Sequence, residues 1–164
     1  MTIDRTISTS NTDFANFSMI IGNFSGENVV NITVDINQDL TKVPIFVSFS
    51  IPNDPSDKSY QRNILKATFN LCRIVEGVAG DFVSKMLAEQ LKKISNISLK
   101  CPIQKGTYNF INFALNDKYL PSYLFKGNIK YLVDAKVMGK VQQRKNLVLL
   151  FTARSFGRVT KSVV

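Results

Sequence analysis

The sequence contains no histidine, only two cysteines and no long hydrophobic run. Without histidine, the chain lacks the Ser-His-Asp and Cys-His arrangements of nucleophilic catalysis, the imidazole ligands of zinc and haem, and the usual acid–base group at neutral pH. The longest aliphatic and aromatic run, Leu147–Phe151, is far shorter than the ~20 residues of a transmembrane helix. We therefore expect a chain without a transmembrane helix that is not an enzyme and that needs no metal or cofactor.

The 164 residues are 45% hydrophobic and 20% charged, a balance typical of one compact domain. No internal repeat, low-complexity tract or long linker divides them, and proline and glycine occur singly between periodic segments. We predict a single domain over residues 1–164, with flexible tails at 1–13 and 158–164.

Basic side chains are concentrated in the later part of the chain, which has a formal net charge of +9 overall. Residues 1–59 hold three basic and seven acidic side chains, whereas residues 60–164 hold 18 basic and five acidic ones, a balance of +13. Two interpretations are open. The cations only solvate the outward faces of strands, or they form a face that binds an anionic partner.

Three features bear on the compartment in which the protein works. The first residues, MTIDRTISTSNTDF, lack the apolar core of a secretory signal, so the chain is either cytosolic or a mature form whose signal is missing. Cys72 and Cys101, 29 positions apart, permit one disulfide or two buried free thiols. Four N-glycosylation sequons favour secretion slightly, and their asparagines are Asn16, Asn23, Asn31 and Asn96.

Alternation of apolar and polar residues dominates the sequence, and it is typical of strands with one buried face. The clearest example is Val30–Ile36. The same pattern predicts strands over residues 43–51, 65–71, 108–115, 129–137 and 147–153, and more weakly over 17–24. Pro44 indicates the beginning of a strand or a sheet edge. Because parallel strands need a helix at each crossover, we predict an antiparallel sandwich of two sheets.

The period changes to that of a helix in one segment. Apolar residues recur in steps of three and four at Val78, Phe82, Met86, Leu87, Leu91 and Ile94. Asp81 near the start and Lys92 and Lys93 near the end match the helix dipole. We predict one α-helix over about residues 78–95, embedded in a mainly β fold.

The segment CPIQKGTYNF, which begins at Cys101, resembles the cysteine–proline motif of the Niemann-Pick type C soluble sterol carrier, a member of the lipid-recognition ML family. The following Leu120-Pro121, Leu124 and Gly127, before a long alternating strand, are similar to the insect CheB-like family, whose members are secreted and related to the ganglioside activator protein. That family also places a cysteine after a strand, here Cys72 in ATFNLC, and a helical stretch before the CP motif. The resemblance covers about residues 60–157.

The resemblance implies a secreted, immunoglobulin-like, antiparallel two-sheet β-sandwich with a Cys72–Cys101 disulfide. It also implies that a lipid or another hydrophobic small molecule, such as a fatty acid, a sterol or a pheromone-like compound, is held between the sheets for transport, presentation or chemosensing. The sterol carriers have three disulfides and this chain can form at most one. Their sterol contacts are therefore not carried over.

The strands and the helix supply apolar residues that could form the walls of such a site. The candidates are Phe49, Phe69, Leu71, Phe82, Met86, Phe110, Phe113, Tyr131, Val133, Leu149 and Phe151. At strand or helix spacing, such residues are more often ordinary core than the wall of a ligand site.

The segment Leu115–Gly127 is unusually apolar for a loop, and it adds Tyr119, Tyr123 and Phe125 to the candidate ligand-binding residues. One interpretation is a lip at the mouth of the site that dips into a membrane, with Lys118 and Lys126 meeting anionic head groups. The other is a plug that folds back over one end of the sandwich.

Two alternative functions remain open at this point. The basic region would suit a nucleic-acid-binding module, but the chain has no RNP-type aromatic motif, no GXXG loop in KH context and no zinc-finger spacing, so nucleic acid is disfavoured as a partner. A receptor-binding module that presents a sheet edge or the aromatic loop is the second alternative.

Overall fold

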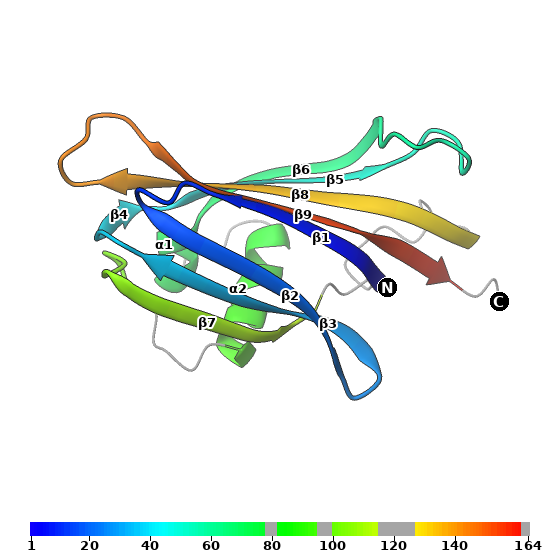
Figure 1. Cartoon of the computed structure of the whole chain (residues 1–164), viewed down its shortest axis with the longest axis horizontal. Helices are drawn as coiled ribbons and strands as arrows, with labels where there is room; N and C mark the ends of the chain where they lie inside the picture. Colours follow the sequence, from blue (N-terminus) through cyan, green and yellow to red (C-terminus); the bar gives the residue numbers. More distant parts are fainter. Residues whose placement is uncertain (78–81, 95–99, 115–126, 162–164) are drawn as a thin grey trace.

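A computed structural model describes residues 1–77, 82–94, 100–114 and 127–161, without the side chains of residues 82, 83, 86, 92–94 and 161. It contains two antiparallel sheets that face each other (Figure 1). The large sheet has the order β1 (Thr2–Ser10), β9 (Val148–Lys161), β8 (Gly127–Val141), β5 (Pro44–Ile51) and β6 (Arg62–Asn70), and the short β4 (Leu40–Lys42) pairs with β8. The small sheet has the order β2 (Ala15–Phe24), β3 (Glu27–Ile36) and β7 (Gly106–Phe113).

The predicted mainly β, immunoglobulin-like two-sheet sandwich is confirmed, and every strand pair that the structure describes between named strands is antiparallel. Each strand expected from alternation is present, including the weaker one, which is β2. Pro44 begins β5, as expected. The sheet-edge alternative is wrong, because β5 pairs with both β6 and β8.

The prediction of flexible tails is wrong for most of their length. Residues Thr2–Ser10 form β1, which pairs with β9 from Thr2 opposite Arg158 to Ser10 opposite Phe151. β9 itself continues to Lys161. Serine and threonine on both faces of β1 remove the apolar alternation that would have revealed the strand.

The predicted helix is present as α2 (Phe82–Ile94), and the structure adds a one-turn helix, α1 (Leu71–Val75). The side chain of Asn70 caps α1 by accepting a hydrogen bond from the backbone N–H of Cys72. Leu87, Ala88 and Leu91 of α2 pack against the large sheet around the buried Phe69 of β6. Since α2 also contacts β7, it bridges the two sheets along one side of the sandwich.

The sheets lie close together at the end that carries β4 and diverge toward the β2–β3 hairpin (Figure 1). At the close end a core cluster combines residues of both sheets, among them Ala15 of β2 and Val137 of β8. A second cluster, around Tyr131 and Val159, lies on the large sheet and contains no small-sheet residue among those the structure describes.

Candidate binding site between the sheets

The register of the large sheet determines which of its side chains face the small sheet. Cross-strand partners point to the same face, so the inward positions form rows across the sheet. One such row consists of small side chains: Ala67 on β6, Val47 on β5, Ala135 on β8, Ala153 on β9 and Ser8 on β1. Aligned sandwiches normally fill a layer about 10 Å deep with interdigitating side chains. This row, which we call the small-residue row, fills little of that layer.

Ala67 and Val47 at one end of this row pack with Phe69 against α2. The small sheet presents larger apolar side chains toward the rest of the row. Strand pairing places five of them on the same face as the buried Val30 and Val34, namely Met19 and Ile21 of β2, Ile32 of β3, and Phe110 and Phe113 of β7. All five remain partly exposed, and the core clusters formed by the described side chains do not include them. In a close-packed interior such side chains would be buried. These five residues and the small-residue row define what we call the inter-sheet site.

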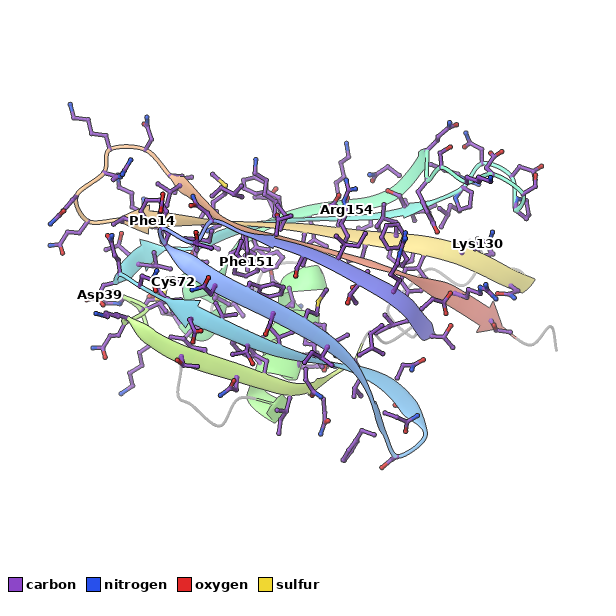
Figure 2. All side chains as sticks on the ribbon, in the orientation of Figure 1. Phe14, Asp39, Cys72, Lys130, Phe151 and Arg154 are labelled. Atoms are coloured by element: carbon purple, nitrogen blue, oxygen red, sulfur yellow. A yellow bond between two sulfur atoms is a disulfide. The ribbon has the colours of Figure 1, made fainter. Side chains whose placement is uncertain are left out.

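The close end of the inter-sheet site is formed by an aromatic pair. Phe151 of β9 stacks on Phe17 of β2, with ring centroids 4.1 Å apart and planes at 10°. Figure 2 shows Phe151 between the sheets. Beyond this pair the first core cluster fills the space with Leu40, Ile103 and Leu150, each at most 2% exposed.

A second aromatic pair lies on the large sheet toward the diverging end. Phe49 and Tyr131 are both buried, with ring centroids 5.3 Å apart, and Val133 packs against their cluster. The Tyr131 hydroxyl donates a 2.9 Å hydrogen bond to the carbonyl oxygen of Thr2. Burial, and to a smaller extent the charge of Asp4, raises the pKa of Tyr131 far above its usual value of 10.0.

Three of the predicted wall residues lie away from the inter-sheet site. Phe69 packs under α2, and Leu71 belongs to α1, where it packs on the first core cluster. Leu149 pairs with Met138 instead of continuing the row of Phe151, because the register shifts at this point of β9. The alternation expected over 147–153 is therefore interrupted, and the neighbouring Leu150 occupies the core position.

Five other candidates lie outside the part of the chain that the structure describes. These are the side chains of Phe82 and Met86, and the residues Tyr119, Tyr123 and Phe125. Whether the segment Leu115–Gly127 is a lip or a plug stays a prediction.

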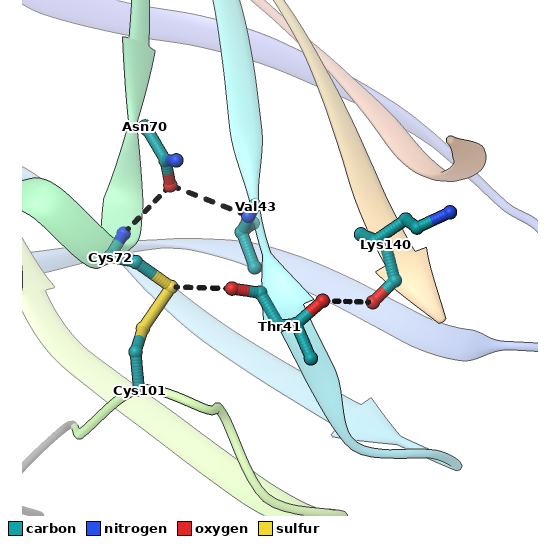
Figure 3. Close-up of a disulfide and its surroundings, with 6 residues drawn as sticks. All are labelled: Thr41, Val43, Asn70, Cys72, Cys101 and Lys140. Atoms are coloured by element: carbon teal, nitrogen blue, oxygen red, sulfur yellow. Dashed lines mark hydrogen bonds between the residues drawn. A yellow bond between two sulfur atoms is a disulfide. The ribbon is translucent and has the colours of Figure 1, made fainter. Parts of the chain in front are cut away.

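The predicted disulfide is present. Cys72 of α1 and Cys101 are bonded with an S–S distance of 2.06 Å (Figure 3). Asn70 Oδ1 accepts hydrogen bonds from the backbone N–H groups of Cys72 at 3.0 Å and of Val43 at 3.4 Å, which holds the end of β6 against the start of β5. Because Cys72 follows β6 and Cys101 precedes β7, the bond ties the large sheet to the small one at the close end.

Sequence reasoning missed the four residues that β2 and β3 contribute to the site and to its aromatic end: Phe17, Met19, Ile21 and Ile32. Their signal was available, because Phe17, Met19 and Ile21 alternate as expected of a strand with one inward face. Four residues of the small-residue row, Val47, Ala67, Ala135 and Ala153, are apolar positions of the alternating strands, but alternation does not show that they align across the sheet.

The described part of the chain offers no metal site, since no three His, Cys, Asp or Glu side chains gather there. It also holds no helix with the length and apolar character required to cross a bilayer.

The comparison with protein families identifies the family to which the chain belongs. The sequence profile described as "Protein of unknown function (DUF1091)" matches residues 45–131, just over half of the chain, and the chain belongs to this family. The matched segment runs from β5 to the first part of β8 and includes both cysteines, both helices and β7. No curated protein matches the sequence.

Proposed function

We propose that this chain is a secreted, non-enzymatic binding protein that holds a lipid or another hydrophobic small molecule between its two sheets. One observation carries the proposal. The five inward apolar side chains of the small sheet stay partly exposed opposite the small-residue row, as expected of walls that a hydrophobic ligand would cover. Apolar walls of this kind bind by removing hydrocarbon from water.

The energy available to such a site is sufficient for useful affinity. Burial of a methylene group contributes about 0.8 kcal/mol, so a C16 chain would contribute on the order of 10 kcal/mol before the costs of ordering and association. A fatty acid, a sterol or a pheromone-like compound are the ligand classes that fit this chemistry, for transport, presentation or chemosensing.

The resemblance to the CheB-like and ML families supports the same function. The family match covers Cys72 and the CPIQKG segment, which are residues that carry this resemblance. The disulfide supports secretion, because such bonds persist in oxidising compartments. Two of the sequon asparagines, Asn16 and Asn23, are exposed and therefore accessible to glycosylation.

Native mass spectrometry of the protein secreted from a eukaryotic host, followed by solvent extraction, tests the proposal directly. We expect a co-purified lipid and displacement of a fluorescent fatty acid by unlabelled ligand. A protein that emerges without lipid and binds no fluorescent fatty acid contradicts the proposal.

A pair of variants locates the ligand. Ala153→Phe adds a ring to the small-residue row, whereas Thr152→Phe adds the same ring to the opposite face of β9. We expect Ala153→Phe to lower the affinity for the fluorescent fatty acid at least about tenfold with little effect on the unfolding midpoint. Thr152→Phe, which removes the hydrogen bond between the Thr152 and Thr9 hydroxyls, should leave the affinity unchanged. If the layer is instead fully packed, Ala153→Phe destabilises the fold by about 1–3 kcal/mol.

A further inference from the structure

The two sheets differ sharply in charge. The strands of the small sheet, β2, β3 and β7, contain no lysine or arginine. β1, β6, β8 and β9 of the large sheet together contain nine lysines and arginines against two aspartates. Eight of the 18 cations of residues 60–164 therefore lie on the large sheet, and none lies on a strand of the small one.

Six of these cations point away from the small sheet. Pairing places them on the same face as the outward Leu132, and they are Arg5, Lys66, Lys130, Lys136, Arg154 and Arg158. We call this surface the basic face; Figure 2 shows Arg154 on it. Lys130 lies directly opposite Arg158, and like charges in such a pair destabilise a sheet.

The carboxylates on the basic face neutralise only part of its charge. Asp134 pairs with Arg154 at 2.9 Å, and Asp4 pairs with Arg158 at 3.4 Å. Among the described residues, Lys66, Lys130 and Lys136 have no ion-pair or hydrogen-bond partner for their ammonium groups.

Exposed apolar side chains lie between these cations. Ile7 is 44% exposed directly opposite Arg154, and Phe46 is 40% exposed directly opposite Lys136. Phe156, on the same face, already has the Arg5 guanidinium 4.4 Å from its ring centroid, and it makes an edge-to-face contact with Tyr60 at a centroid distance of 5.7 Å.

We propose that the basic face docks on a lipid bilayer that contains anionic lipids. Charge complementarity supplies the attraction, and the exposed Ile7 and Phe46 beside cations match the junction of head groups and acyl chains. A single-stranded nucleic acid stacks successive bases on several aromatic rings, whereas this face offers the exposed ring of Phe46 and a ring of Phe156 that Arg5 and Tyr60 already contact. A sulfated glycan has no apolar chain that would cover the exposed Ile7 and Phe46. The proposal goes beyond ligand binding between the sheets, because it concerns the opposite face of the large sheet.

Vesicle co-sedimentation tests the proposal with the protein alone. We expect the wild-type protein to bind phosphatidylcholine vesicles that contain phosphatidylserine and not to bind pure phosphatidylcholine vesicles. The binding should weaken as the salt concentration is raised. The variant Lys66→Gln/Lys130→Gln/Lys136→Gln should bind roughly 100-fold more weakly. The matched variant Lys85→Gln/Lys100→Gln/Lys105→Gln removes the same charge from exposed sites on α2 and before β7, and it should bind within about threefold of the wild type.

The chain has no tryptophan, so a single introduced tryptophan reports on its own surroundings. Phe46→Trp should shift its emission to the blue on phosphatidylserine vesicles, whereas Ile20→Trp, on the outward face of β2, should not. The emission shift is measured on proteins that keep all their lysines, so it does not depend on whether the charge variants fold.

Three outcomes overturn the proposal. The first is equal loss of binding in both lysine variants, which would make net charge alone responsible. The second is a blue shift in Ile20→Trp but not in Phe46→Trp, which would place the small sheet on the bilayer. The third is binding of heparin or a single-stranded oligonucleotide without any vesicle binding, which would assign the basic face to a soluble polyanion.

Discussion

Phe17 and Phe151 stack across the two sheets at 4.1 Å, and they mark the place where the sandwich changes from a filled core to the inter-sheet site. On one side of this pair, side chains of both sheets are nearly completely buried. On the other, Met19 and Phe113 face the large sheet but stay partly exposed. The pair therefore determines how far the sheets can separate at that point.

Removal of either ring should weaken the fold. Both rings are only partly buried, so we expect Phe17→Ala and Phe151→Ala each to cost about 2–3 kcal/mol in the free energy of unfolding, with a coupling of about 1 kcal/mol in a double-mutant cycle. Urea denaturation of the four proteins measures this. Phe24→Ala, at a ring 56% exposed in β2, should stay within about 0.5 kcal/mol of the wild type. Additive losses would show that the rings do not interact.

The disulfide should be a major source of stability, because it closes a loop of 29 residues in the unfolded chain. We expect Cys72→Ala/Cys101→Ala to lower the free energy of unfolding by about 3–4 kcal/mol. Urea denaturation of the wild type with a reductant should give a similar loss, and adding the reductant to the double variant should change nothing further. An unchanged midpoint in the double variant would contradict this prediction.

Stability should fall at alkaline pH because of Tyr131. Its pKa is raised by burial in the folded protein, so the stabilisation is complete below pH ~10, where an unfolded tyrosine is protonated, and is lost as pH rises above that value. Tyr131→Phe should flatten this alkaline loss and cost about 1 kcal/mol at neutral pH through the lost hydrogen bond to Thr2.

Urea denaturation across the pH range from neutral to alkaline measures both effects. Tyr108→Phe is the control, because burial also raises the pKa of the half-buried Tyr108, and this variant should flatten the alkaline loss less. An equally steep loss in Tyr131→Phe and the wild type would refute the assignment to Tyr131.

Gly157 should tolerate no side chain. A Cβ atom at this position would lie 2.0 Å from the carbonyl oxygen of Thr2 and 2.6 Å from the Tyr131 hydroxyl. We expect Gly157→Ala to destabilise the fold by about 3 kcal/mol in thermal or urea unfolding. Gly22→Ala is the matched change on β2, where the nearest atom is the side-chain nitrogen of Asn31 at 3.3 Å, and it should cost less than about 1 kcal/mol.

Most of the fold could be predicted from the sequence, because strands with one buried face have a distinct period. β3, β5 and β8 show that period in apolar residues, and α2 shows the helical period. β1 could not be predicted, since its stability comes from pairing with β9 rather than from an apolar face. α1 is too short for a periodic signal, and only the Asn70 cap indicates it.

The candidate site could be predicted only in part, because alternation gives the face of a residue but not the depth of packing on that face. Phe110 and Phe151 were assigned to the inward face, and the structure places them there. Nothing in the alternation distinguishes the partly exposed Phe110 from the buried Phe49. The register shift at Leu150 also has no signal in the apolar residues around it, since Val148, Leu149 and Phe151 are apolar too.

The Cys72–Cys101 bond lies at the close end, where an isolated backbone bridge also joins Leu40 of β4 to Ile103, which precedes β7. The two sheets are thus joined covalently at the close end, whereas they diverge at the opposite end. Under the proposed function, a larger ligand would therefore be accommodated at the diverging end, away from the disulfide.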